Sequence, residues 1–214
     1  MSLLSNYISN LADYIFPRFC VSCGKEGGLL CSVCGIDWRA NNLFAKNNGK
    51  HFFSFNYANP IARDLIKAWK YDFDQSAWQI LQEKLTLNLF CLADYIKVMQ
   101  IKALLPIRLH PRRLRERGFD QAVEIANFLA NCLHIPVLPI LKRIRYTKQQ
   151  VKVMDTKTRV AAMRDNPFII EADVPANVML VDDVWTTGAT AKAAARAVKR
   201  AGAKEVFFYT LAKG

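Results

Sequence analysis

The stretch "VMLVDDVWTTGAT", residues 178–190, joins four apolar residues to two aspartates and a loop rich in threonine. Every residue from 178 to 181 is apolar, which is typical of a parallel strand that helices cover on both faces. Asp182 and Asp183 follow the run directly. We therefore predict a buried strand with two adjacent carboxylates at its carboxyl end.

The residues after the aspartates are typical of an anion-binding loop between a strand and a helix. In the helix predicted over 189–201, the first backbone N–H groups and the positive end of the dipole converge on this loop. Gly188 permits a left-handed backbone and close approach, and threonine hydroxyls add uncharged donors. The predicted phosphate-binding residues are Thr186, Thr187, Gly188, Ala189 and Thr190.

Two carboxylates beside a phosphate site repel the phosphate unless another group occupies them. Ribose hydroxyls can donate hydrogen bonds to Asp182 and Asp183, and we expect magnesium to accompany the ligand. A phosphorylated ribose therefore fits both halves of the stretch. The chain contains no G-x-x-x-x-G-K-[ST] sequence, which argues against a Walker-type nucleotide loop.

Residues 178–190 resemble the phosphoribosyl pyrophosphate (PRPP) binding signature of type I phosphoribosyltransferases. The rest of the chain fits that resemblance, because strands alternate with helices from residue 101 onward, as in a parallel sheet. We expect an α/β fold: a type I phosphoribosyltransferase-like parallel sheet with flanking helices, a small N-terminal zinc module and a helical hood, the subdomain that selects the nucleobase. The predicted strands are 51–57, 103–107, 136–141, 168–170, 178–181 and 206–211, and the predicted helices are 2–15, 60–69, 76–94, 121–133 and 189–201.

Four of the six cysteines form two C-x2-C pairs separated by seven residues. This spacing suits a closed tetrahedral zinc site with a structural role, although two disulfides are an alternative. The predicted zinc ligands are Cys20, Cys23, Cys31 and Cys34. We expect Cys91 and Cys132, which stand singly in apolar periodic segments, to be buried packing residues.

Composition indicates a cytoplasmic globular protein. The chain has 214 residues, 52% of them hydrophobic, and a formal net charge of +12. No apolar run approaches the ~20 residues of a membrane span, and the first 17 residues lack Lys and Arg, which argues against a secretory signal. The positive charge favours phosphate-rich partners without identifying one.

Most of that charge lies in residues 101–164, which contain fourteen Lys and Arg against four Asp and Glu. A solvated basic face is the alternative to a binding surface. By analogy of chain order with type I transferases, the loop after the first strand binds pyrophosphate or nucleic acid through Arg112, Arg113, Arg115, Arg117 and Gly118. The same analogy places a catalytic loop at residues 143–159, where further contacts, or else a solvated hairpin, are expected at Arg145, Lys148 and Gln150. Trp185 either packs on the helix or stacks on a base.

Three further segments extend the resemblance to the competence protein F family: "LIKAWKYD" (65–72), "LLPIRLHPRRLRERGFDQA" (104–122) and "LKRIRYTKQQ" (141–150). Together with the two C-x2-C pairs and the PRPP signature, they match that family in order along nearly the whole chain. The resemblance implies a cytoplasmic protein of natural transformation that handles incoming single-stranded DNA. It also implies other transformation or recombination proteins as partners, through which any membrane association would be made. The family more often has asparagine where Asp120 stands.

The expected organisation is an N-terminal helix and zinc module (1–50), a helical hood or connector (51–100) and a phosphoribosyltransferase-like domain (101–214). Our first functional hypothesis is a DNA-uptake factor that binds single-stranded DNA and uses a PRPP-type pocket, either catalytically or as a sensor. The alternatives are a phosphoribosyltransferase of nucleobase salvage and a non-enzymatic, zinc-dependent interaction module. We find no convincing general base in the sequence.

Overall fold

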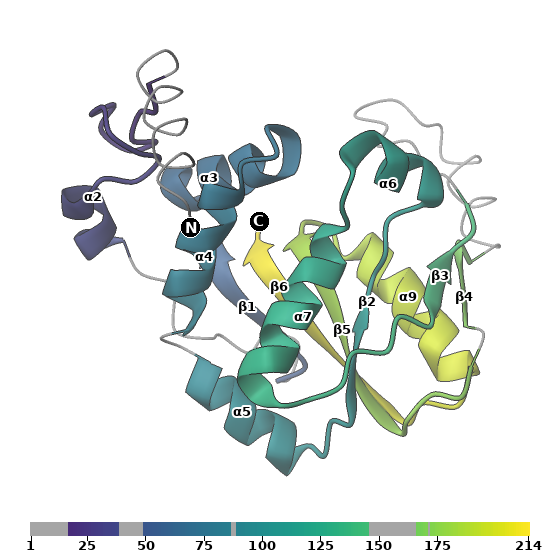
Figure 1. The fold of residues 1–214 in the computed structure, drawn as a ribbon. Coiled ribbons are helices and arrows are strands. Elements are labelled where there is room, and N and C mark those ends of the chain that lie inside the picture. Colours follow the sequence, from purple (N-terminus) through teal and green to yellow (C-terminus); the bar gives the residue numbers. More distant parts are fainter. Residues whose placement is uncertain (1–16, 39–48, 87–88, 146–165, 171) are drawn as a thin grey trace, which may run out of the picture.

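The computed structural model describes residues 17–38, 49–86, 89–145, 166–170 and 172–214, and its centre is a four-stranded parallel sheet (Figure 1). The strand order is β1-β6-β5-β2, with every neighbouring pair parallel. This arrangement confirms the predicted parallel sheet. The four strands are β1 (His51–Asn56), β2 (Ala103–Pro106), β5 (Asn177–Trp185) and β6 (Glu205–Lys213).

Because side chains alternate in direction along each strand, each face of the sheet has its own hydrophobic core. In β5, Met179 and Val181 belong to one core, whereas Val178 and Leu180 belong to the other. All four side chains are buried, as the continuous apolar run predicts. Helices therefore have to cover both faces.

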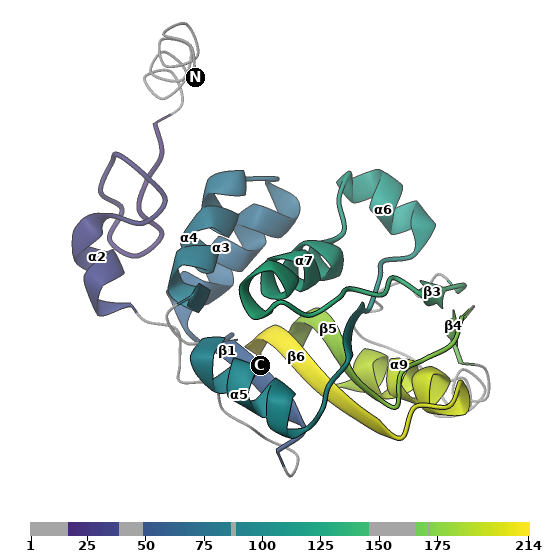
Figure 2. The ribbon, with the colours of Figure 1, turned by 60° about the horizontal axis from the view of Figure 1, so that its bottom comes forward.

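Among the described residues, four helices cover one face of the sheet and a single helix covers the other (Figures 1 and 2). Helix α9 (Ala189–Arg200) is rich in alanine and packs closely on β4 (Phe168–Ile170), β5 and β6. Helix α7 lies across β2 and β5 on the opposite face. The helices of the α7 face are α3 (Pro60–Tyr71), α4 (Gln75–Thr86), α5 (Leu89–Val98) and α7 (Gln121–Leu133), and α9 spans Ala189–Arg200.

The segment 51–100 shares the sheet with the C-terminal half of the chain. Its strand β1 is an edge strand beside β6, with His51 in register with Phe208. Helix α3 follows. The side chain of its N-cap residue, Asn59, accepts a hydrogen bond from the Ala62 N–H. Leu65 of α3 is buried. The expected helical hood is therefore anchored through a strand of the same sheet.

The predicted strand at 136–141 is wrong in most of its length. Only Val137 pairs in parallel with β2, through a single bridge to Leu104. Pro136 and Pro139 lack the N–H groups that a longer ladder needs. The chain then forms β3 (Leu141–Arg143), which pairs antiparallel with β4 (Phe168–Ile170). The strand predicted at 168–170 is therefore present, but in a second two-stranded sheet.

Several other boundaries differ from the prediction. Strand β5 continues past Val181 through both aspartates to Trp185, because β6 keeps pairing with it up to that residue. The loop after β2 contains a short helix, α6 (Pro111–Arg117), and the helix predicted at 76–94 is divided into α4 and α5. The predicted helix at 2–15 lies outside the described residues.

The expected packing role of Cys91 and Cys132 is wrong, since both side chains are exposed. In a helix the apolar face is wide but not complete, and these cysteines lie on the solvent side of α5 and α7. A short helix, α2 (Ser32–Asp37), follows the third cysteine of the N-terminal cluster. Within the part of the chain that the structure describes, no helix has the length and apolar character that a membrane crossing requires.

We predict that the described residues between 51 and 214 unfold as one cooperative unit. Leu65→Ala in α3, where the wild-type side chain is 0% exposed, should lower the free energy of unfolding by about 2–5 kcal/mol. Urea unfolding followed by far-UV circular dichroism measures this loss. Phe90→Ala, which removes a side chain that is 79% exposed, is the control and should change stability little. Two separate transitions for Leu65→Ala would contradict the prediction.

Candidate functional site

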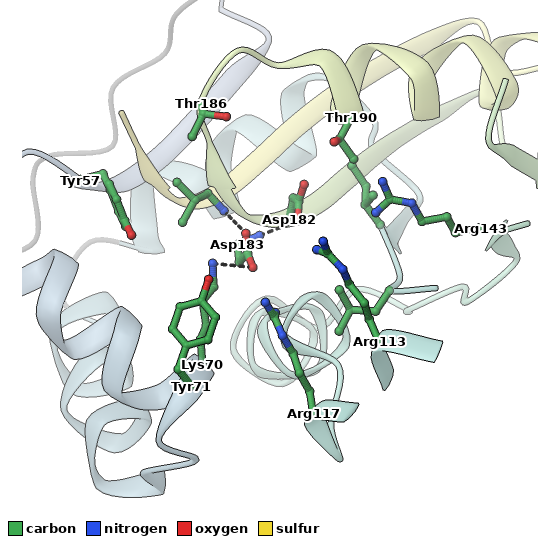
Figure 3. A pocket seen from close by; sticks show the side chains of 13 residues that line it. Tyr57, Lys70, Tyr71, Arg113, Arg117, Arg143, Asp182, Asp183, Thr186 and Thr190 are labelled. Atoms are coloured by element: carbon green, nitrogen blue, oxygen red, sulfur yellow. Dashed lines mark hydrogen bonds and ion pairs between the residues drawn. The ribbon is translucent and has the colours of Figure 1, made fainter. Parts of the chain in front are cut away.

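A cavity of about 490 Å³ opens at the carboxyl ends of the central strands. The two aspartates of β5 lie at its centre, arginines approach from one side, and Lys70 and two tyrosines approach from the other (Figure 3). A position at the carboxyl ends of parallel strands is where α/β folds bind ligands. The sequence pattern and the cavity therefore point to the same place.

The two adjacent aspartates serve opposite sides of the sheet because they are consecutive residues of one strand. Asp183 continues the series of Met179 and Val181, whereas Asp182 continues that of Val178 and Leu180. Each carboxylate also accepts a local backbone hydrogen bond: Asp183 N–H donates to Asp182 Oδ1 at 2.8 Å, and Val184 N–H donates to Asp183. These bonds fix both carboxylates at the cavity.

Lys70, at the end of α3, forms an ion pair with Asp183 across the cavity. Its Nζ lies 2.6 Å from Asp183 Oδ2, and the Lys70 residue is only 8% exposed. A buried ammonium without a partner would be strongly unfavourable, so this pair holds both charged groups in place. Lys70 thus connects the 51–100 segment to the aspartates of the C-terminal half.

Burial raises the pKa of Asp182 to about 8, and the adjacent Asp183 carboxylate adds to the rise. The Asp183 N–H, Lys70 and Arg143 act in the opposite direction and lower it. At neutral pH Asp182 is therefore protonated far more often than an exposed aspartate. Arg143, on β3, has its own pKa lowered by burial and raised again by Asp182. These two groups therefore interact at the α9 side of the cavity.

Helix α6 divides the predicted arginines into two sets. Arg113 and Arg117 are spaced by four residues and both line the cavity, as expected for one face of a helix. Arg112 and Arg115 are exposed and do not line it, and Arg112 Nε pairs with Glu116 at 3.2 Å. The forked guanidinium donors of the first set suit phosphate oxygens inside the cavity.

The start of α7 holds both ends of α6 in position. Asp120 is 7% exposed, and its Oδ2 accepts a hydrogen bond from the Leu109 N–H at 2.9 Å, just before α6. Arg117, in the last turn of α6, donates to Gln121 Oε1 at 3.0 Å. Burial raises the pKa of Asp120, whereas the Leu109 N–H and Arg108 lower it. The buried side chains of Asp120, which precedes α7, and of Gln121, its first residue, thereby direct α6 toward the cavity.

The threonine loop (residues 186–190) contains one residue in a backbone conformation that glycine favours. Gly188 caps α9 with φ +71°, as predicted, and an added Cβ would lie 2.4 Å from Cζ2 of Trp185. Trp185 is 8% exposed and stacks on His51 of β1 with ring centroids 4.1 Å apart. His51 Nε2 is 2.9 Å from Thr210 Oγ1 on β6. The loop therefore rests on a buried aromatic support.

Trp185 consequently packs beneath the loop, and base stacking by this residue is not what the structure shows. The predicted loop residues fall into two groups around it. Thr186 and Thr190 line both the main cavity and a small adjoining hollow of about 40 Å³. The other predicted loop residues line only that hollow: Thr187, Gly188 and Ala189.

Two further predicted contacts, Gly118 and Arg145, do not line the cavity. Gly118 caps α6 in the left-handed conformation, and Arg145 is exposed beyond β3. Lys148 and Gln150 lie outside the described residues. Ligand contacts by Asp182 and Asp183 and by the threonine loop stay predictions, although the structure gathers these side chains around one cavity.

Sequence reasoning missed Lys70, Tyr57, Tyr71 and Arg143 as cavity residues. A signal for Lys70 was present, because it stands four residues after Ile66 on the apolar face of α3. A lysine on a buried helix face needs an anionic partner. Tyr57 reaches the cavity only because β1 pairs with β6, which no local pattern reveals.

The four N-terminal cysteines form a separate cluster in which all four sulfurs lie within 4.8 Å of one another. Cys23 and Cys31 sulfurs are 3.7 Å apart, which is far too long for a disulfide and close to the ~3.8 Å between ligands of a tetrahedral zinc with Zn–S bonds of ~2.3 Å. All four are free thiols. The donor set fits a structural zinc ion and disfavours the disulfide alternative.

Comparisons with known proteins agree with the fold and the motifs. Residues 120–214 match the phosphoribosyl transferase domain. Competence protein ComFC of Streptococcus pneumoniae is 27% identical over 94% of this chain and 85% of its own length. Competence protein F of Haemophilus influenzae is 27% identical over 92% of this chain and 85% of its own length. Competence protein ComFC of Bacillus subtilis is 27% identical over 92% of this chain and 78% of its own length.

Among solved structures, a purine phosphoribosyltransferase from Pyrococcus horikoshii is 19% identical, with a TM-score of 0.36 over 62% of this chain and 83% of that chain. The resemblance to the competence protein F family, expected from the motifs, is confirmed by the three competence relatives and the domain match. The predicted fold class is confirmed by the domain match, the parallel sheet and the four-cysteine cluster.

We predict that Gly188→Ala destabilises the protein more than Gly118→Ala. Both glycines have nearly the same positive φ, but an added Cβ meets nothing within 4 Å at Gly118 and meets Trp185 at Gly188. The control substitution should cost about 1–2 kcal/mol from backbone strain alone, and Gly188→Ala should exceed it. Urea unfolding of both variants measures the difference. Equal losses of unfolding free energy in the two variants would contradict the prediction, because they would show that Trp185 moves away from the added Cβ at no cost.

We predict that the protein binds about one zinc ion per chain through the four-cysteine cluster. Cys23→Ser should remove most of this zinc and make residues 17–38 sensitive to proteolysis, because the metal joins the two C-x2-C turns. Cys91→Ser changes an exposed thiol outside the cluster and is the matched control. Metal analysis and limited proteolysis provide the readouts. Full zinc content in Cys23→Ser would contradict the assignment.

Proposed function

We propose that this chain is a cytoplasmic factor of natural transformation that handles incoming single-stranded DNA and carries a pocket for PRPP. Its similarity to competence proteins and its phosphoribosyl transferase domain support a role in competence. The observation that supports the pocket most directly is the meeting of two aspartates, a threonine loop and arginines around one cavity.

Each group in the cavity has a role in this proposal. Asp182 and Asp183 accept hydrogen bonds from ribose hydroxyls, and Thr186 and Thr190 donate to the ribose phosphate. Arg113, with Arg117 and Arg143, takes the pyrophosphate, and bound magnesium would offset part of its negative charge.

The DNA-binding surface in this proposal lies outside the cavity. Arg112 and Arg115 are on the exposed side of α6, and the exposed Lys142 and Arg145 lie on or just after β3. Such residues contact phosphates independently of sequence. The two sides of α6 would then serve two ligands, with DNA passing the mouth of the nucleotide pocket.

Two double variants of α6 test this division with the same loss of charge. Arg112→Ala/Arg115→Ala should weaken binding of an oligonucleotide and reduce the slope of log K against log salt by about 1.4, the value for two lost phosphate contacts. Arg113→Ala/Arg117→Ala should weaken PRPP binding about tenfold or more and leave the DNA salt slope closer to that of the wild type. Fluorescence anisotropy and calorimetry measure the two affinities.

The proposal fails if the wild-type protein binds neither ligand, or if its DNA affinity does not depend on salt. If both double variants lose both ligands equally, the two sides of α6 do not serve different ligands. Circular dichroism of each variant verifies that the fold is retained.

A second candidate function is phosphoribosyl transfer to a free nucleobase. Tyr57 lines the side of the cavity opposite the arginines, and Tyr71 lines it where the Arg117 guanidinium lies 5.2 Å from its ring centroid. An aromatic base could be held beside these two rings. Positioning and charge stabilisation can carry such a transfer without a general base. Pyrophosphate release from PRPP, measured with free bases and with single-stranded DNA, distinguishes the two: release that needs a base favours salvage.

The interaction-module alternative makes the zinc cluster essential and the aspartates dispensable. It requires cells with Cys20→Ala to lose transformation while cells with Asp182→Ala/Asp183→Ala keep it. The opposite result would exclude this alternative.

A further inference from the structure

We infer that Lys70 allows the cavity to bind a ribose phosphate without a divalent metal ion, by acting as a fixed cation beside the aspartates. This inference rests on the proposed PRPP-type function and deepens it, because it states what the ribose end of the ligand requires. Magnesium would then be needed only at the pyrophosphate end.

The position of Lys70 leaves its ammonium little alternative to the aspartates. Its side chain is 9% exposed, and Nζ lies 2.6 Å from Asp183 Oδ2. The backbone is held by the preceding turn of α3, where Ile66 and Trp69 are 0% exposed. The amino group therefore cannot exchange freely between Asp183 and bulk water, and it remains a permanent counter-ion in the site.

Charge in the described lining already favours an anion without added metal. Four cationic side chains face the cavity against two carboxyl groups, Asp182 and Asp183. The four cations are Lys70, Arg113, Arg117 and Arg143. Asp183 is neutralised directly by Lys70, and Arg143 lies near Asp182. A divalent ion near the aspartates would have to compete with these fixed charges.

The threonine loop completes the site for the phosphate by itself. Thr186 and Thr190 carry uncharged donors, and Gly188 places the start of α9 at the small hollow. With Asp183 neutralised by Lys70 and Asp182 faced by Arg143, a ribose hydroxyl and a phosphate can bind at neighbouring points without the repulsion that would otherwise call for a metal. Lys70, from α3, thus allows the aspartates and the threonine loop to bind one ligand together.

Lys67 provides a matched control on the same helix. It lies about one turn before Lys70, its side chain is 51% exposed, and its Nζ is 3.8 Å from Asp64. Lys67→Met and Lys70→Met remove the same charge with the same replacement. Lys70→Gln provides a second, polar replacement of the buried lysine, and circular dichroism verifies the fold of each variant.

The experiment is calorimetric titration with ribose 5-phosphate and with PRPP, in buffer freed of divalent ions by a chelating resin and again with millimolar magnesium. Metal analysis verifies that the protein keeps its zinc. We expect wild-type protein and Lys67→Met to bind ribose 5-phosphate with dissociation constants that magnesium changes by less than about threefold. Lys70→Met and Lys70→Gln should bind at least about tenfold more weakly without magnesium and recover part of that loss with it.

Two results would overturn the inference while leaving the proposed function intact. One is wild-type protein that binds ribose 5-phosphate only with magnesium; the other is folded Lys70→Met and Lys70→Gln with wild-type affinity in metal-free buffer. Failure of the wild-type protein to bind either ligand under both conditions would instead reject the proposed PRPP pocket, and the inference with it.

Discussion

The structure around the site depends on the cost of placing two adjacent carboxylates at the end of a strand that is buried on both faces. Because neighbouring side chains of a strand point to opposite faces, each carboxylate needs its own cationic neighbours. Lys70 of α3 meets Asp183 on one face, and Arg143 of β3 lies near Asp182 on the other. The positions of α3 and β3 are thereby tied to the chemistry of the cavity as well as to the hydrophobic core.

Features encoded by neighbouring residues were predictable from the sequence, and features that need distant pairing were not. The apolar run before Asp182, the glycine that caps α9 and the cysteine spacing are local patterns with a direct physical meaning. The split of the α6 arginines was accessible in principle, since Pro111 and Gly118 mark the ends of a one-sided helix. Tyr57 required knowledge that β1 joins the sheet beside β6, whereas the position of Lys70 on the apolar face of α3 indicated only that it needed an anionic partner.

The wrong expectations arose where the surrounding structure, rather than the local sequence, determines the environment of a residue. Apolar residues at 136–141 resemble a strand, but two prolines reduce their pairing with β2 to a single bridge. For Trp185 both packing and base stacking were open from the sequence, and the structure places its ring under the loop against His51. Cys91 and Cys132 fall on the solvent side of otherwise apolar helices. In each case the residue type was compatible with two environments, and tertiary packing selected one.

The pairing of β1 with β6 also determines when the sheet can form during synthesis. His51 contacts Thr210 across 159 residues of sequence, so the first strand of the sheet waits for the last before its ladder forms. Contacts so distant are slow to form because a long loop must close first. Until then, Phe52 and Phe55 lack the β6 residues of the same core, which include Tyr209 and Leu211. A chain in which β6 has not yet paired therefore exposes apolar surface, and such surface favours aggregation.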